Sequence, residues 1–153
     1  MIAREELTYT WYEKAILVML YLNKGEMSKQ KICELLYLIY RELEKVDSLE
    51  DLEFYLNMKT KRIEITTPDR KDNIDDIFSF LSQGDLVEIK YKNKDIDILL
   101  TKKGQEFTEA IIQEPALKNE VDIIIDIFTR FKDFSEQGLI NLILENLKHS
   151  NIL

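Results

Sequence analysis

The sequence predicts an α+β fold that is mostly helical, and three observations support this. Apolar residues recur at spacings of three and four along most of the 153 residues, which is the period of amphipathic helices. Two short segments at about 86–100 alternate with period two around the turn "KNKD", which is typical of a β-hairpin. The chain contains only four Gly and two Pro, which favours long regular elements over irregular loops.

The first two helices are expected at 8–23 and 28–46. The centre of the first, "AILVMLYL", is apolar on every face, which predicts a helix that is buried on all sides. We expect Gly25 to end this helix in the left-handed conformation and Ser28 to cap the next one. The second helix carries a core stripe made of Ile32, Leu35, Leu36, Ile39, Leu43 and Val46.

Aromatic side chains are concentrated in these two helices. They could line a pocket for a small ligand, but packing in the core or at a subunit interface is the interpretation that their spacing favours. The residues are Tyr9, Trp11, Tyr12, Tyr21, Tyr37 and Tyr40.

The middle of the chain predicts two short strands followed by a third helix. The strands are "LEFYLNM" and "RIEIT", which flank the basic turn "KTKR". The helix is expected at 68–83, with Thr67 as its N-cap and Pro68 in its first position. Gly84 should end it. Its start is rich in acids, which the positive end of a helix favours. These acids are Asp69, Asp72, Asp75 and Asp76.

Helices follow the hairpin as far as the C-terminus. Thr101 should cap the first, and two more are expected at 116–131 and 135–149, the last capped by Ser135.

We assign residues 1–112 to one domain and 113–153 to a helical extension of the same compact unit. The last two helices carry apolar residues on more faces than one small domain can cover, which predicts a homodimer through them. Those residues are Ile123, Ile124, Ile125, Ile127, Phe128, Phe131, Leu139, Ile140, Leu142, Ile143, Leu144 and Leu147.

The composition indicates a globular protein from a reducing compartment. The single cysteine, Cys33, cannot form an internal disulfide and is expected to be a buried core thiol. The start "MIAREEL" lacks the apolar core of a signal peptide. The longest apolar run, 15–22, is too short to cross a bilayer. We therefore expect a cytoplasmic protein without membrane contact.

The sequence lacks the parts of common enzyme and metal sites. Zinc requires several Cys or His ligands, and the chain has only Cys33 and His149. Gly is too scarce for a phosphate loop or a dinucleotide fingerprint. The aspartate cluster at 69–76 could hold a metal, but it lacks the Gly and Glu spacing of an EF-hand. We expect no catalysis, no metal and no cofactor.

The charge distribution directs attention to the hairpin. The net charge of −8 opposes a general nucleic-acid coat, because Lys and Arg dominate phosphate binding. Residues 57–104, however, hold 10 basic and 9 acidic residues and form the one segment that is not acidic. Its cations could contact DNA phosphates, or they could only keep an exposed hairpin soluble. The candidate phosphate contacts are Lys90, Lys92, Lys94, Lys102, Lys103, Lys59, Lys61 and Arg62.

Three motifs resemble those of winged helix-turn-helix proteins over about residues 10–112. These are "ILVMLYLNKGEMSKQKICELLYLI", "IDDIFSFLSQGDLVEI" and "LLTKKGQEF". They are similar to the MarR/PadR-like regulators and to archaeal or phage-associated YwgA-type proteins. The matching positions are Leu35, Leu36, Tyr37, Leu38, Ile39, Leu81, Gly84, Leu86, Val87, Leu100, Thr101, Lys103, Gly104 and Phe107. The resemblance implies a winged helix-turn-helix with a β-hairpin wing and C-terminal helices.

Two functions follow from this resemblance. The first is a dimeric transcriptional regulator that binds double-stranded DNA, with Arg70, Lys71 and Asn73 on its recognition helix. The second is a winged-helix module for protein–protein interaction that does not contact DNA. The acidic third helix favours the second function, whereas the resemblance and the basic hairpin favour the first, which is the function that we expect.

Overall fold

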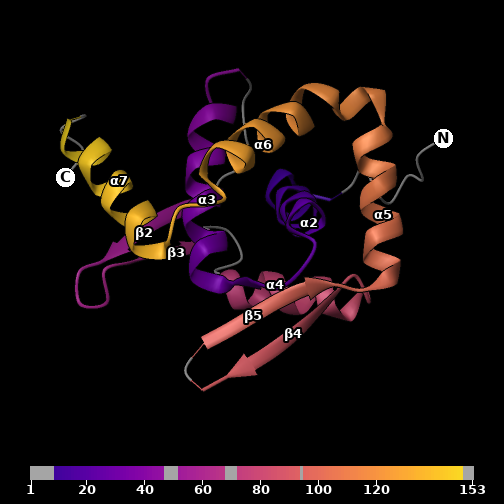
Figure 1. Cartoon of the computed structure of the whole chain (residues 1–153), viewed down its shortest axis with the longest axis horizontal. Helices are drawn as coiled ribbons and strands as arrows, with labels where there is room; N and C mark the ends of the chain where they lie inside the picture. The colour runs from indigo at the N-terminus through magenta and orange to yellow at the C-terminus, as the bar shows by residue number, and fades with distance from the viewer. Residues whose placement is uncertain (1–8, 47–51, 68–71, 94, 150–153) are drawn as a thin grey trace.

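The computed structural model describes residues 9–46, 52–67, 72–93 and 95–149, and it has an α+β fold that is mostly helical (Figure 1). The helices are α2 (Trp11–Asn23), α3 (Lys29–Leu43), α4 (Ile74–Gln83), α5 (Lys102–Gln113), α6 (Lys118–Phe131) and α7 (Glu136–His149), with a 3-10 turn η1 (Pro115–Leu117). The strands are β1 (Met27–Ser28), β2 (Glu53–Asn57), β3 (Arg62–Thr66), β4 (Val87–Lys92) and β5 (Asp95–Leu100). The predicted α+β class is confirmed.

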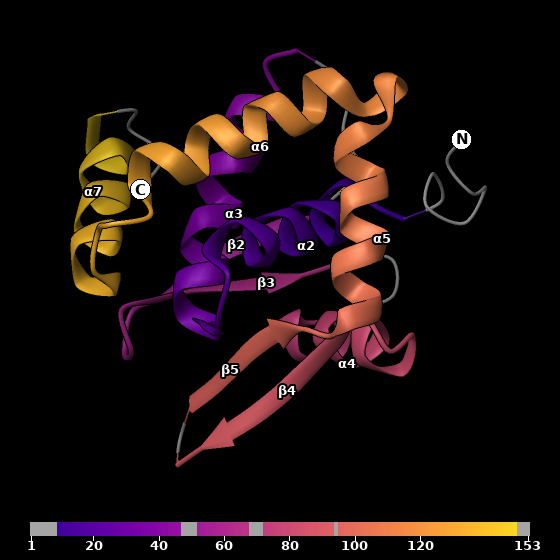
Figure 2. The same cartoon turned by 45° about the vertical axis from the view of Figure 1, so that its right-hand side comes forward.

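Helix α2 is the centre of the core, as its uniformly apolar sequence predicts. Every residue from Trp11 to Leu20 is buried, and α3, α5, α6 and β5 surround the helix (Figures 1 and 2). It starts at a capping box between Thr10 and Glu13. The prediction that Gly25 ends it in the left-handed conformation is wrong, because Lys24 adopts that conformation with φ 59°.

Helix α3 is capped by Ser28, whose hydroxyl accepts a hydrogen bond from the Lys31 N–H at 3.2 Å. Its predicted core stripe is buried up to Leu43. Val46 is an exception, since its side chain is 68% exposed. The helix ends at Leu43, so Val46 does not continue the stripe and its assignment to the core is wrong.

The segment after α3 forms the predicted hairpin of β2 and β3. The two strands are antiparallel, with Phe54 opposite Ile65 and Asn57 opposite Arg62. Ile63 and Ile65 are buried, and β3 packs against α3. Figure 2 shows this hairpin as a second projection beside the one formed by β4 and β5.

Helix α4 begins at Ile74, later than the predicted start at residue 68. Asn73 is its N-cap and forms a capping box with Asp76. Thr67 does not cap this helix, because its N–H donates to the Asp72 carbonyl at 2.8 Å and closes a loop instead. Residues 68–71 lie outside the described residues. Gly84 follows the helix as predicted.

The β4–β5 hairpin and the short strand β1 form a three-stranded antiparallel sheet in the order β1-β5-β4. Thr101 caps α5 as predicted, because its hydroxyl accepts a hydrogen bond from the Gly104 N–H at 2.9 Å. A Cβ atom at Gly104 would lie 2.0 Å from the Leu86 carbonyl oxygen. Only glycine therefore allows the first turn of α5 to cross the residue before β4 so closely.

The C-terminal helices pack on the core more completely than the sequence suggests. Helix α6 contacts both α2 and α3, and α7 contacts α3. Half of the twelve apolar residues that predicted a homodimer are covered within the chain, and five of the others are partly exposed, so the homodimer stays a prediction. The buried residues among them are Ile124, Ile127, Phe128, Leu139, Ile140 and Ile143.

Among the described residues, no helix combines the length and apolar character that crossing a bilayer requires.

Candidate nucleic-acid interface

The predicted DNA contacts lie on three parts of the fold. Lys90 and Lys92 are on β4, and Lys102 and Lys103 are in the first turn of α5. The third group lies at the β2–β3 turn and comprises Lys59, Lys61 and Arg62. Three further candidates, Arg70, Lys71 and Lys94, are outside the described residues.

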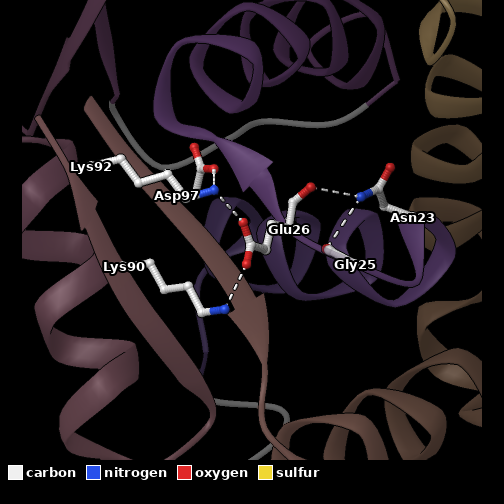
Figure 3. Close-up of polar contacts among 6 residues, drawn as sticks. All are labelled: Asn23, Gly25, Glu26, Lys90, Lys92 and Asp97. Atoms are coloured by element: carbon white, nitrogen blue, oxygen red, sulfur yellow. Dashed lines mark hydrogen bonds and ion pairs between the residues drawn. The ribbon is translucent and has the colours of Figure 1, made fainter. Parts of the chain in front are cut away.

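One carboxylate, Glu26, pairs with both described lysines of the wing. The Lys90 ammonium lies 2.6 Å from one oxygen of Glu26, and the Lys92 ammonium lies 2.8 Å from the other. Lys92 also lies 3.0 Å from Asp97 on the neighbouring strand. Figure 3 shows Glu26 between the two lysine side chains, with one oxygen facing each of them. The two described lysines of the hairpin are therefore paired with two carboxylates of the same chain.

The local fold explains why Glu26 lies there. The Asn23 side chain donates hydrogen bonds to the carbonyls of Gly25 and Glu26, at 3.1 and 3.0 Å, and so holds the turn after α2 (Figure 3). The next residues form β1, in which Ser28 is opposite Asp97 of β5. Asp97 is in turn opposite Lys90 of β4. Alternation along the strands thus places Glu26 on the same face of the sheet as the lysines.

These contacts shift the pKa values of Glu26, Lys90 and Lys92. Hydrogen bonds from Lys90 and Lys92 lower the pKa of Glu26 from 4.5 to about 2. The hydrogen bond to Glu26 in turn raises the pKa of each lysine. Charge-assisted contacts of this kind favour the ionised form of every partner. Glu26 and the two lysines therefore stay ionised at neutral pH with a net charge of +1, and Asp97 beside Lys92 adds a second carboxylate to the network.

The fold brings the β2–β3 hairpin into contact with the β4–β5 hairpin, so the candidate phosphate contacts of both lie near one another. Arg62 at the start of β3 lies 3.5 Å from Asp95 at the start of β5. This contact also pairs a predicted phosphate ligand with an acid. Lys59, Lys61 and Lys102 form no ion pair within the residues that the structure describes, and Lys103 donates to the Gly84 carbonyl at 3.2 Å.

Helix α4 does not present the side chains expected of a DNA-reading helix. Its sequence IDDIFSFLSQ contains no Lys or Arg. Its exposed residues include Asp76 and Phe80, and the Phe80 ring is 53% exposed. The side chain of Asn73, a predicted base contact, is used in the N-terminal cap. This face is acidic and partly apolar, which opposes contact with phosphates.

The remaining candidates of the sequence have structural roles. Cys33 is buried as predicted, and burial raises the pKa of its thiol to about 12. The aromatic residues of α2 and α3 pack on one another and on β2; for example, the rings of Tyr40 and Phe54 are 5.2 Å apart. In the described parts of the chain, no group of three or more potential metal ligands lies together.

Nothing in the local sequence marks Glu26 as a functional residue. The two strands that align Glu26 with the lysines, β1 and β5, are about 70 positions apart in the sequence, and β1 has only two residues. No local period therefore indicates their pairing.

Comparison with known proteins found no matching family model, no similar curated protein and no similar solved structure.

Proposed function

We propose that this chain is a winged-helix module that docks on a protein surface and does not hold DNA with its wing. The observation that carries the proposal is the pairing of Glu26 with both Lys90 and Lys92. A wing that binds phosphates needs free cations, since releasing counterions from DNA drives most of the affinity. Here the two lysines already have carboxylate partners.

The order of the elements supports the winged-helix assignment. Helix α2, strand β1, helices α3 and α4, and the hairpin β4–β5 follow one another in the order that the resemblance implies, with β1 paired to β5. The β2–β3 hairpin is an insertion between α3 and α4. Fold alone does not decide function, so the choice between DNA and protein rests on the side chains.

Exposed aromatic side chains on α4 and β4 support a protein partner. Phe80 on α4 is 53% exposed, and Tyr91 on β4 is 77% exposed. Exposed aromatic residues among balanced charges are characteristic of protein interfaces, where aromatic side chains supply much of the binding energy. We further propose that the module works as a homodimer.

DNA binding is tested with a fluorescently labelled duplex of random sequence. Fluorescence anisotropy is measured at about 20 mM and about 200 mM salt, a range over which several phosphate contacts would change the affinity strongly. The proposal predicts no salt-dependent binding by the wild type. Binding at low salt that weakens steeply with added salt would overturn the proposal and favour a DNA-binding regulator.

A matched pair of variants sharpens the same experiment. Glu26→Gln frees Lys90 and Lys92, whereas Glu106→Gln removes the same charge from an exposed position on α5. Glu106 forms no ion pair within the described residues. We expect the first variant to bind the duplex more tightly at low salt than the second, with a salt slope up to about two units steeper. Equal binding by the two variants would show that Glu26 does not mask the wing.

A further inference from the structure

A groove with an apolar floor and a basic rim lies where α3, α6 and α7 meet. It has a volume of about 390 Å3. Leu38 and Ile127 form its floor together with the half-buried ring of Phe131. Helix α7 bounds it on the outside of the molecule, where it packs mainly on α3 (Figures 1 and 2).

The rim of this groove carries an excess of positive charge. Lys45 is paired with Glu42 at 3.1 Å, and Arg130 is paired with Asp126 at 3.1 Å. The third cation, Arg41, contacts only the Tyr37 hydroxyl, at 3.4 Å, and the face of its ring. Arg41 has no carboxylate partner within the described residues. In a protein with a net charge of −8, a cation left unpaired above an apolar floor indicates an acidic occupant.

Helix α7 has a second face with the complementary properties. Leu139 and Ile143 point into the core and are fully buried. Leu142 lies on a different side of the helix and is only half-buried, and Glu145, three residues further, is exposed. Glu145 is the only charged residue at 137–147, so it is the acid that the Leu142 side of the helix offers, and Lys148 lies three residues beyond it.

We propose that the groove receives α7 of a second copy of this chain, with Glu145 of each copy facing Arg41 of the other. Because each copy carries both the groove and the helix, the contact is reciprocal and closes as a twofold dimer. Leu142 would then cover the floor at Leu38 and Ile127. This inference rests on the proposed homodimer and is independent of whether the wing binds DNA.

The proposal is tested by charge reversal, with the molar mass measured by light scattering during size-exclusion chromatography. We expect a wild-type dimer at about 100 μM and a weakening of at least about tenfold in dimer affinity for Arg41→Glu and for Glu145→Arg, since like charges meet in each. The double variant Arg41→Glu/Glu145→Arg restores the opposite charges, so we expect it to dimerise again. Lys118→Glu, which makes the same charge change as Arg41→Glu at an exposed position of α6 outside the groove, should leave the dimer intact.

Circular dichroism establishes that each variant is folded before its mass is interpreted. A wild-type monomer at about 100 μM would overturn both the homodimer and the groove contact. A wild-type dimer that neither reversal weakens, or reversals that the double variant does not rescue, would overturn the groove contact alone. Neither result bears on the DNA measurement, so the two proposals fail separately.

Discussion

The wing sheet and the α3–α6–α7 groove both gather basic side chains, but they differ in what lies opposite the cations. In the wing, Lys90 and Lys92 share Glu26, which neither the hairpin sequence nor its turn contains. In the groove, Arg41 has no acid beside it among the described residues. The β4–β5 hairpin has the denser run of lysines in sequence, yet its described lysines are paired, whereas Arg41 of the groove has no carboxylate partner among the described residues.

The difference shows that ion pairs with acids from distant segments decide which cations remain free. The number of lysines in one segment does not decide this. In an antiparallel sheet, residues on three adjacent strands that share one face lie within reach of one another. An acid before β1 and a second acid on β5 can therefore balance two lysines on β4. On a helix, an acid partner must be three or four residues away or come from another element.

The largest expected effect concerns the junction that holds the wing sheet in place. Gly104→Ala should destabilise the fold by about 2 kcal/mol or more, because the new methyl group would overlap the Leu86 carbonyl oxygen. Gly25→Ala is the control, since the nearest atom to its Cβ is 4.0 Å away. Urea denaturation measures both. If the two variants were equally stable, α5 could shift away from the wing and the sheet would not depend on this contact.

The second effect concerns the other side of this comparison, helix α3, where Glu34 is fully buried. Burial raises its pKa from 4.5 to about 7, so the folded state favours the protonated form. The cost of ionisation grows as the pH rises from about 4.5 to 7, and it is complete above that range. Glu34→Gln should therefore stabilise the protein by about 2 kcal/mol at pH 8 and by much less at pH 5.

Urea denaturation at the two pH values, at one fixed protein concentration, measures this difference. Glu106→Gln is the control, since it removes an exposed carboxylate and should change stability little at either pH. An equal effect of Glu34→Gln at pH 5 and pH 8 would mean that the Glu34 carboxyl is hydrated in the folded protein.

The smallest effect concerns the wing itself. The pKa of Glu26 is lowered to about 2, so its contribution to stability is present above pH 4.5 and is lost as the pH falls through 2. Glu26→Gln should be slightly less stable than the wild type at pH 6, and the difference should disappear as the pH approaches 2. The pair is exposed, so added salt should also reduce the difference. A difference that persists at pH 2 would require a cause other than charge.

Much of this fold could be predicted from the sequence, because its core follows local periods. The stripe of α3 up to Leu43, the buried centre of α2 and both hairpins follow from spacing alone. The start of α4 was placed too early, because Thr67 and Pro68 match a helix start, whereas Asn73 and Asp76 form the actual capping box. Two good caps in one segment compete, and tertiary contacts select between them.

The candidate site was less predictable than the fold. The wing lysines were identified from the alternating pattern, but their pairing with Glu26 depends on the two-residue strand β1. The groove depends on how three helices cross, and Arg41 has no distinctive sequence context. The Glu26 ion pairs and the groove both depend on contacts between distant segments. The spacing of apolar residues within one segment does not indicate such contacts.

The central claim is that Glu26 pairs with Lys90 and Lys92, and the most direct test is an NMR titration of the Glu26 side-chain carboxyl carbon. We expect a pKa of about 2 in the wild type and a return toward 4.5 in the Lys90→Ala/Lys92→Ala double variant, which lacks both donors. A wild-type pKa near 4.5 that the double variant leaves unchanged would contradict the claim, because the lysines would then be free to bind phosphates.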